Sequence, residues 1–395
     1  MEAHIIYRNY LMPNGIGMSI GGIQTYLTNL SHVLVEEGYH VSIYQRGDQD
    51  FHTVINENLE VFGYERPEDK VRGRAQMLYE KARLRINPSR GDILIFGCES
   101  MAVKTDGSVP VIGIQHGISW DIPEAGLGQQ RWNFLYFKKQ YRAWKTAQRI
   151  KNIDKLICVD CNFINWYKAL VPCPEVKMYY IPNFSALPEE KVEKPKPDSG
   201  IGIIFARRFE PQRGTRLFMK VSKKLLNEYD NIDITIAGDG SDEKLLKENL
   251  ESNPHVKFIR YQSSESLSIH SDKHIAVVPT LGSEGTSLSL LEAMASSCAV
   301  VCTNVGGMTN IVINGYNGLM VAPLEDDLYQ ALKTLIDNRK LRETLAARGY
   351  ETIESTFSLS RWQDGWRGIL KSLQSRQKIN HQKKKNLPVP SFDDR

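Results

Sequence analysis

The chain has 395 residues, of which 41% are hydrophobic and 24% are charged, with a formal net charge of +4. This composition is that of an ordinary soluble globular protein of two or three domains, and the small net charge does not define a nucleic-acid-binding protein. The N-terminus lacks the pattern of a signal peptide, and no run of about 18 uncharged apolar residues predicts a transmembrane helix. We therefore expect a cytoplasmic protein with reduced cysteines. Cys158 and Cys161 form a CxxC pair, with Cys173 beyond it, but no fourth ligand at a matching spacing would complete a zinc site.

Short apolar runs alternate with amphipathic segments through the first half of the chain. The predicted strands are residues 4–8, 40–44, 92–97, 110–115, 155–159 and 177–181. Between the first two, Ile23, Leu27, Leu30 and Leu34 recur at helical spacing. Strands that alternate with helices predict a parallel sheet covered on both faces.

The same rhythm returns after a polar segment rich in proline and charge, residues 185–200, which is typical of an interdomain linker. The strands predicted beyond it are 201–206, 232–238, 255–259, 274–279, 299–303 and 318–322. The sequence therefore predicts two tandem Rossmann-like, doubly wound α/β domains over residues 1–184 and 201–356. We expect a C-terminal helix over 357–378 that returns to the first domain, and then a basic flexible tail over 379–395.

Two carboxylates stand in the small, apolar segment "GSEGTSLSLLEAMASSCAVVC", residues 282–302. Ligands of open α/β sheets bind beyond the carboxyl ends of the strands, and this segment follows the strand at 274–279. Thr286 or Ser287 is the expected N-cap of the next helix, whose first amides form an anion site with Glu284 at its mouth. Glu292 lies about two turns into the helix, where a sugar diol could satisfy it; a salt bridge to a neighbouring helix is the alternative.

Three other segments follow predicted strands. Arg208 and Arg213 bracket a turn after the strand at 201–206 and suit a diphosphate, although each alone could belong to a solvated loop. His116 lies just past another strand, where it could be catalytic or merely structural. Residues 14–26 nearly match the dinucleotide fingerprint, but Ile20 stands where glycine is required, which disfavours a nicotinamide enzyme.

These residues resemble those of the GT-B fold glycosyltransferases of family GT4, which are retaining enzymes that use nucleotide sugars. The most specific similarity is the E-x7-E pattern "EGTSLSLLE" with the segment that follows it, about forty residues in all. Weaker similarities are the glycines Gly21 and Gly22, "QHG" with His116, "IPN" with Asn183, and "RFEPQRG" in place of the family's G-R-L-x-x-x-K-G. The resemblance implies a site in the cleft between the two domains.

The resemblance also implies a role for each residue. Glu284 contacts hydroxyls of the donor sugar, Glu292 holds the ribose hydroxyls, and His116 approaches the donor sugar from the first domain. Arg208, Arg213 and the amides of Gly285, Thr286 and Ser287 bind the diphosphate, while Gly21 and Gly22 border the donor phosphates and the acceptor. The sequence departs from the pattern in four places: Arg207 and Phe184 replace glycines, Arg213 replaces a lysine, and Ser287 stands where many members have glycine.

The implied reaction moves a hexose from a nucleotide sugar, with UDP the commonest carrier in the family, to a sugar acceptor in polysaccharide or glycolipid biosynthesis. Cations and helix amides would stabilise the departing diphosphate and replace a metal, so no cofactor is expected. Asp48-Gln49-Asp50 resembles the metal-binding DxD of the other glycosyltransferase fold, but its surroundings do not fit. The alternatives are a sugar-nucleotide epimerase or hydrolase of the same fold and a non-catalytic sugar-nucleotide-binding subunit.

Residues 131–152 mix aromatic residues with lysine and arginine and contain almost no acidic residues. Such a helix can lie on an anionic membrane surface, to which Lys383–Lys385 of the tail could add. In the alternative, which we favour slightly, the aromatic face packs into the first domain and the charges face water. Because many members of the family glycosylate lipid-carried acceptors, we expect weak peripheral association with the inner face of the cell membrane.

Overall fold

The computed structural model describes residues 1–19, 21–65, 73–118, 134–171, 176–190, 194–195, 200–282 and 284–385, without the side chains of 134–136 and 374–385. Contacts divide the chain into two units. The first comprises Met1–Gly113, Asn152–Lys155 and Gln363–Arg395, and the second comprises Ile114–Lys151 and Leu156–Trp362. This division runs through two strands rather than through the predicted linker at 185–200. Residues 191–193 and 196–199 of that linker lie outside the described residues.

An eight-stranded sheet has the order β3-β4-β2-β1-β5-β6-β7-β8. Its strands are β1 (Glu2–Ile6), β2 (His40–Gly47), β3 (Phe51–Asn56), β4 (Leu59–Glu65), β5 (Ile93–Phe96), β6 (Val111–Gln115), β7 (Lys155–Cys158) and β8 (Lys177–Tyr180). The helices between them are α1 (Gly22–Glu36), α2 (Arg74–Arg83), α3 (Phe134–Ile150) and α4 (Cys161–Leu170), with 3-10 turns at Pro88–Arg90 and Glu99–Met101. All six strands predicted in this half are present, and β1 pairs in parallel with both β2 and β5.

The strands β3 and β4 were not predicted. They pair antiparallel at the edge of the sheet, where β3 exposes most of its side chains and so carries little apolar periodicity. Phe51 of β3 packs against Gly63 of β4 so closely that a Cβ on Gly63 would lie 1.9 Å from the Phe51 ring. The glycine therefore makes room for an aromatic cross-strand contact that sequence periodicity does not reveal.

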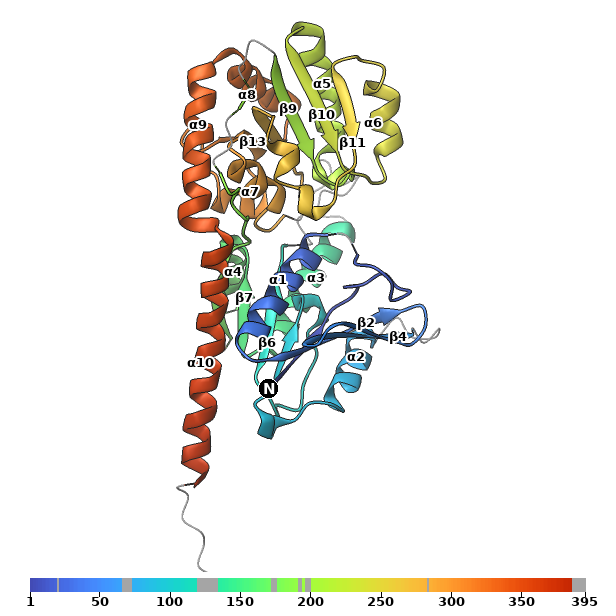
Figure 1. Ribbon diagram of the computed structural model, residues 1–395, viewed down its shortest axis with the longest axis vertical. Coiled ribbons are helices and arrows are strands. Elements are labelled where there is room, and N and C mark those ends of the chain that lie inside the picture. The colour runs from blue at the N-terminus through green and yellow to red at the C-terminus, as the bar shows by residue number, and fades with distance from the viewer. Residues whose placement is uncertain are drawn as a thin grey trace, which may run out of the picture. The chain divides into compact units, whose positions relative to one another are not determined.

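The second sheet lies wholly in the second unit and has the order β11-β10-β9-β12-β13-β14, with parallel neighbours throughout (Figure 1). Its strands are β9 (Ile201–Ala206), β10 (Ile232–Ala237), β11 (Val256–Ile259), β12 (Ile275–Val278), β13 (Ala299–Thr303) and β14 (Leu319–Val321). The helices are α5 (Thr215–Glu228), α6 (Glu243–Leu250), α7 (Leu288–Ala295), α8 (Glu325–Asp337) and α9 (Arg339–Thr352). Shorter helical turns are Pro211–Arg213, Ser263–Glu265, Ser268–His270, Gly306–Asn310 and the π-helical Ile353–Phe357. All six strands predicted here are confirmed.

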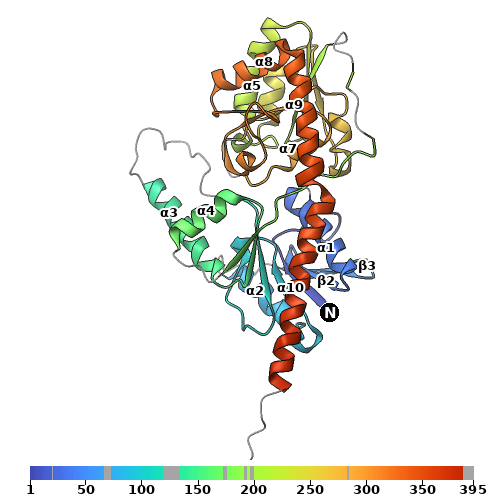
Figure 2. The ribbon, with the colours of Figure 1, turned by 90° about the vertical axis from the view of Figure 1, so that its left-hand side faces the viewer.

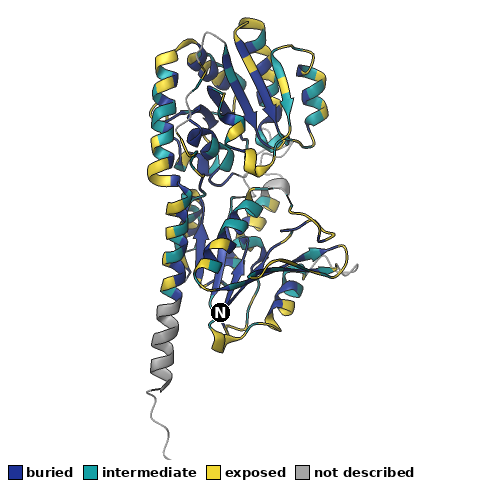
Figure 3. Ribbon diagram, in the orientation of Figure 1, coloured by how far each residue is buried: buried dark blue, intermediate teal, exposed yellow. Residues whose placement is uncertain are grey.

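Two apolar layers cover this sheet because alternate residues of each strand point to opposite faces. Ile203 and Phe205 of β9 join the cluster that contains Phe218 of α5, whereas Ile204 and Ala206 join the cluster that contains Leu290 and Leu291 of α7. The central strands are therefore buried on both sides (Figure 3). This arrangement is the doubly wound fold that the sequence predicts.

The last helix, α10 (Leu359–Lys385), is uninterrupted (Figure 2). It continues through residues 379–385, where the flexible tail was expected; this segment ends in three lysines, which are good helix formers, and the first helix-breaking residue is Pro388. Residues 386–395 lie outside the described chain. In the first unit, the buried Trp366 of α10 donates from Nε1 to the hydroxyl oxygen of Tyr26 in α1 at 2.9 Å. The C-terminal helix thus returns to the first helix of the chain.

We predict that Trp366→Ala lowers the free energy of unfolding by about 3–5 kcal/mol, because it removes a fully buried aromatic side chain. Tyr26→Phe keeps the ring but removes the hydroxyl oxygen that accepts the indole hydrogen bond, which should cost about 1–3 kcal/mol. Arg361→Ala, an exposed position on the same helix, is the control and should change stability by less than about 0.5 kcal/mol. Urea unfolding followed by circular dichroism measures all three, and a wild-type midpoint for Trp366→Ala would contradict the packing of α10 on α1.

Candidate functional site

The candidate site lies at the topological switch point of the second sheet, where the order in which the chain adds strands reverses. The strands β9 and β12 are neighbours, but the chain goes from β9 to β10 on one side and from β12 to β13 on the other. The loops that follow these two strands therefore diverge and leave room for a ligand between them. These loops carry the residues at 207–214 and 279–287 that the sequence singled out, apart from Ser283, which lies outside the described residues.

A glycine brings the two loops together. Gly214 has a φ of +79°, and a Cβ there would lie 1.8 Å from the carbonyl oxygen of Pro279, so no other residue fits. Next to it, the amide of Leu281 donates to the carbonyl of Gln212 at 2.9 Å. These contacts hold Arg213 beside the loop that carries Glu284.

Two guanidinium groups and a hydroxyl converge on one oxygen of Glu284. Its Oε2 accepts from Arg207 Nη2 at 2.5 Å, from Arg213 Nη1 at 2.6 Å and from Thr280 Oγ1 at 3.0 Å. Arg207 Nη1 also donates to Thr280 Oγ1 at 2.5 Å, so the threonine hydroxyl links the arginine to the carboxylate. Arg207 and Glu284 are only 7% and 9% exposed. The carboxylate is thus held rigidly in a buried, charge-assisted network.

The charges in this cluster set its protonation. Burial alone would raise the pKa of Glu284, but the charges of Arg213 and Arg207 outweigh burial and hold that pKa below its usual value. Burial lowers the pKa of Arg207, which the nearby Glu284 opposes; a guanidinium nevertheless stays protonated near neutral pH. Two positive charges and one negative charge leave the cluster with a net positive charge that favours an anionic ligand.

Sequence reasoning missed Arg207, which it recorded only as a departure from a glycine. The predicted pair was Arg208 and Arg213, but the structure joins Arg207 with Arg213 at Glu284 and leaves Arg208 exposed. Two adjacent residues that leave a strand point to opposite sides, so only one of two consecutive arginines can face inward. Two arginines directly after a buried strand were the available signal.

The backbone of Glu284 is fixed independently of its side chain. The amide of Gly307 donates to the Glu284 carbonyl at 3.1 Å. Gly306, with a φ of +54°, lies so close that a Cβ would come within 2.1 Å of the same carbonyl oxygen. The pair of glycines after β13 is therefore required for the approach of this turn to the glutamate.

The helix α7 begins at Leu288 with Ser287 as its N-cap, one of the two residues predicted for that position. The Thr286 hydroxyl donates to the carbonyl of Val159, and Asn183 Nδ2 donates to the carbonyl of Thr286 at 2.6 Å. Asn183 Oδ1 is buried and has no hydrogen-bond partner among the described residues. Val159 and Asn183 thus hold the segment before α7 in place. The amides of the first turn of α7 have no partner within the helix and point along its axis, where an anion can bind.

The segment "QHG" meets this turn. A Cβ on Gly285 would lie 2.3 Å from the carbonyl oxygen of His116, so the backbone at His116 packs directly against Gly285. The preceding residue, Gln115, is fully buried, and neither polar atom of its side chain has a partner among the described residues. Sequence reasoning overlooked Gln115 because it lies inside an apolar strand.

Glu292 lies partly buried on α7. Burial raises its pKa to about 7, and a hydrogen bond with the Ser266 side chain opposes this shift. In the described part of the chain no cation pairs with it, which disfavours the alternative of a structural salt bridge. A carboxyl group in this setting can accept hydrogen bonds from a diol when it ionises.

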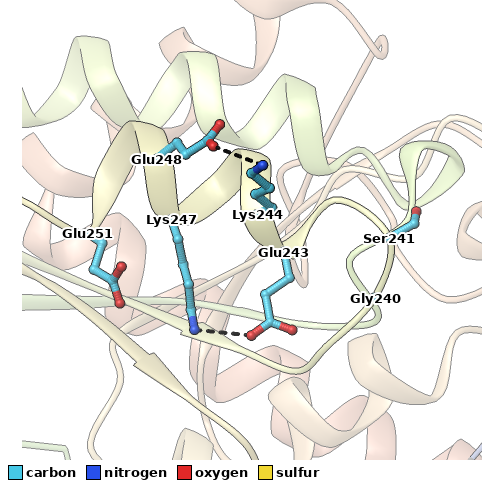
Figure 4. Close-up of a pocket in the computed structure, with 7 residues that line it drawn as sticks. All are labelled: Gly240, Ser241, Glu243, Lys244, Lys247, Glu248 and Glu251. Atoms are coloured by element: carbon cyan, nitrogen blue, oxygen red, sulfur yellow. Dashed lines mark ion pairs between the residues drawn. The ribbon is translucent and has the colours of Figure 1, made fainter.

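Gly21 and Gly22 lie at the start of α1 in the first unit, where Gly21 is the N-cap residue. Their part in the donor site stays a prediction. A hollow of about 560 Å³ lies elsewhere in the second unit, along α6 (Figure 4). Its lysines pair with its own glutamates, Lys247 with Glu243 at 3.2 Å and Lys244 with Glu248 at 3.8 Å. It contains none of the predicted site residues.

Comparisons with known proteins bear on this geometry. The model of the Glycosyltransferase Family 4 matches residues 20–185, and that of the Glycosyl transferases group 1 matches residues 188–352. An uncharacterised glycosyltransferase of Methanocaldococcus jannaschii is 27% identical over 359 residues, 88% of this chain and 93% of that protein. The capsular polysaccharide biosynthesis glycosyltransferase CapM of Staphylococcus aureus is 27% identical over 175 residues, 43% of this chain and 45% of that protein.

Solved structures share the fold at low sequence identity. Sucrose-phosphate synthase of Thermosynechococcus elongatus superimposes with a TM-score of 0.75 at 15% identity, covering 95% of this chain and 100% of that one. A mutant of TarM from S. aureus, solved with UDP, superimposes with a TM-score of 0.69 at 12% identity, covering 94% and 100%. The two matched models follow one another along nearly the whole chain, as do the two parallel-sheet domains, and the chain is therefore a glycosyltransferase of the GT-B fold.

Proposed function

We propose that this glycosyltransferase transfers a hexose from a UDP-linked sugar to a lipid-carried sugar acceptor, with retention of configuration, in cell-surface polysaccharide or glycolipid biosynthesis. The observation that carries the proposal is the carboxylate of Glu284, held by Arg207 and Arg213 beside the start of α7. It combines a fixed acceptor for sugar hydroxyls with a positive anion site. The reaction takes place on the cytoplasmic side of the membrane.

The diphosphate of the donor lies against the first-turn amides of α7, Arg213 and the exposed Arg208. Glu284 accepts hydrogen bonds from the sugar, Glu292 from the ribose, and His116 approaches the sugar beside Gly285. Asn183 Oδ1, which is buried without a partner among the described residues, is available as a further acceptor. No metal takes part, because arginines and helix amides neutralise the diphosphate.

In the reaction the bond between the anomeric carbon and the phosphate oxygen breaks, and the electron pair leaves with the diphosphate. The acceptor hydroxyl forms the new bond from the same face and gives its proton to the β-phosphate. Negative charge grows on the leaving group, where preorganised donors lower the barrier most effectively. Removing one such donor commonly raises a barrier by about 2.7–4 kcal/mol.

Two relatives support the finer parts of the proposal. The TarM structure was solved with UDP, and CapM is named for capsular polysaccharide biosynthesis. A site that binds sugar hydroxyls at Glu284 and a nucleoside diphosphate beside α7 agrees with what both names say of those proteins. The proposed class of acceptor is taken from the relatives. The choice of uracil as the base of the donor is taken from the commonest nucleotide carrier in the family.

The first prediction separates two adjacent arginines. Arg207→Ala leaves the buried Glu284 with one guanidinium fewer, so the free energy of unfolding should fall by about 3–5 kcal/mol. Arg208→Ala, at the exposed neighbouring position, should leave stability within about 0.5 kcal/mol but lower kcat roughly 100- to 1000-fold. Urea unfolding and turnover of the UDP sugar measure the two effects.

A rescue variant tests the cause of the instability. Arg207→Met combined with Glu284→Gln removes both charges and should recover most of the lost stability without recovering activity. Equal stability of the Arg207→Ala and Arg208→Ala variants would show that the pair with Glu284 does not matter. Wild-type turnover of Arg208→Ala would remove this arginine from the leaving-group site.

The second prediction identifies the nucleotide. Thermal unfolding is measured with UDP, GDP, dTDP or ADP, each in the presence of EDTA, and UDP should raise the Tm by several degrees. A ligand at 100 times its Kd adds about 2.7 kcal/mol of stability. A rise with another nucleotide would overturn the choice of base, and a UDP shift that disappears with EDTA would contradict the metal-independent site.

The third prediction concerns pH. Because burial raises the pKa of Glu292 to about 7, the free protein carries this carboxyl largely protonated at pH 6. Ribose hydroxyls donate to the ionised form, so UDP binding should release a proton near pH 6.5 and tighten as pH rises through 7. Calorimetry in two buffers of different ionisation enthalpy counts the protons. Glu292→Gln is the control, because the phosphate of UDP titrates in the same way with this variant as with the wild type. Equal proton release from both proteins would contradict the binding of ribose by Glu292.

A further inference from the structure

The helix α3 has two distinct sides. Ala143, Ala147 and Ile150 are buried and recur at helical spacing, so they mark the inward side of the helix. The opposite side contains the large aromatic residues. Phe137, Tyr141 and Trp144 are 57%, 58% and 53% exposed. The slightly favoured expectation, that the aromatic face packs inward, is therefore wrong for these three residues, since Ala143, Ala147 and Ile150 take the buried positions instead.

The exposed aromatic residues form one stripe. Their spacing of four and then three residues places them on the same side of the helix, and the rings of Tyr141 and Trp144 stack with centroids 5.9 Å apart. Exposed aromatic residues are normal when they are scattered singly, but a contiguous row marks an interaction surface.

A stripe of cations runs beside the aromatic one. Lys138, Arg142 and Lys145 each follow one of the three aromatic residues directly, which places them about 100° further round the helix, and Arg149 continues the same row. Lys138, Arg142 and Lys145 are exposed. Residues 134–150 include five basic residues and no acidic residue, so nothing within the helix neutralises this charge.

We propose that the exposed side of α3, Phe137 to Arg149, docks on the surface of an anionic lipid bilayer. Tyrosine and tryptophan settle at the level of the lipid headgroups, while lysine and arginine bind the anionic phosphates beside them. An acidic protein partner would use the cations but would not require three exposed rings in a row, and the small net charge of +4 does not define a nucleic-acid-binding protein. No described helix is long and apolar enough to cross a membrane, so the attachment is peripheral.

The proposal does not depend on the donor site, and its test is separate from nucleotide binding. The full chain is sedimented with vesicles of phosphatidylcholine alone or with 30% phosphatidylglycerol, at about 50 and 500 mM salt. We expect binding to the anionic vesicles only, and weaker binding at the higher salt because surface charge is screened. Failure to bind anionic vesicles at low salt overturns the proposal, as does equal binding to both lipids.

Matched variants assign the binding to α3. Lys138→Gln/Arg142→Gln/Lys145→Gln should weaken it roughly a hundredfold, since each cation near the surface contributes about 1 kcal/mol. The control, Lys244→Gln/Lys257→Gln/Lys340→Gln, removes the same charge from exposed lysines elsewhere and should bind like the wild type. If the control loses as much as the α3 variant, net charge rather than this surface is responsible and the proposal fails.

The role of the aromatic stripe is tested by measuring whether Trp144 enters the bilayer. Brominated lipids in anionic vesicles should quench the fluorescence of Trp144, so that Trp144→Phe removes most of the quenching while it preserves binding. Phe137→Ser/Tyr141→Ser/Trp144→Ser should weaken binding at least tenfold. Unchanged quenching in Trp144→Phe, or unchanged affinity in the triple variant, would show that the rings stay in water and overturn docking through this face. Nucleotide-induced thermal shifts confirm that each variant is folded.

Discussion

The ion pair between Arg207 and Glu284 is the interaction on which the site of the second unit depends. A carboxylate with 9% exposure is costly unless cations and donors surround it, and here Arg207, Arg213 and Thr280 all meet the same oxygen. The fold supplies these partners from two loops that diverge at the change of direction in the sheet. The glycine contact at Gly214 then brings the loops close enough for the network to form.

The two strands that carry these loops also explain why the site is preorganised. Both β9 and β12 lie in the middle of a sheet buried on both faces, so the loop ends cannot move without disturbing the core. Glu284 is fixed a second time through its carbonyl and Gly307. A charged cluster that is held in place before a ligand arrives needs little reorganisation when charge develops on a leaving group, as the proposed reaction requires.

The sequence predicted the strands and pointed to the loops of the candidate site because both depend on local patterns. Apolar runs between helical segments locate the twelve confirmed strands, and ligands of such sheets bind beyond their carboxyl ends. The edge hairpin β3–β4 could not be found in this way, since Phe51 and Gly63 meet across strands. The choice between Arg207 and Arg208 likewise depends on which side of the chain faces Thr280. The exposed aromatic stripe of α3 was misjudged because periodicity reveals two faces of a helix but not which one is buried.

A carboxylate whose partners hold one oxygen cannot turn about its own axis, and this has a stereochemical consequence. Three donors on Oε2 of Glu284 also fix the direction of the other carboxylate oxygen. A substrate hydroxyl that meets such a group at the right angle forms a strong bond, whereas the same hydroxyl on the opposite face of the ring misses it. A site that pairs with a hydroxyl discriminates more sharply than one that merely encloses it. With Glu284 bound to the donor sugar as proposed, Arg207 would act through this carboxylate on which epimer is accepted.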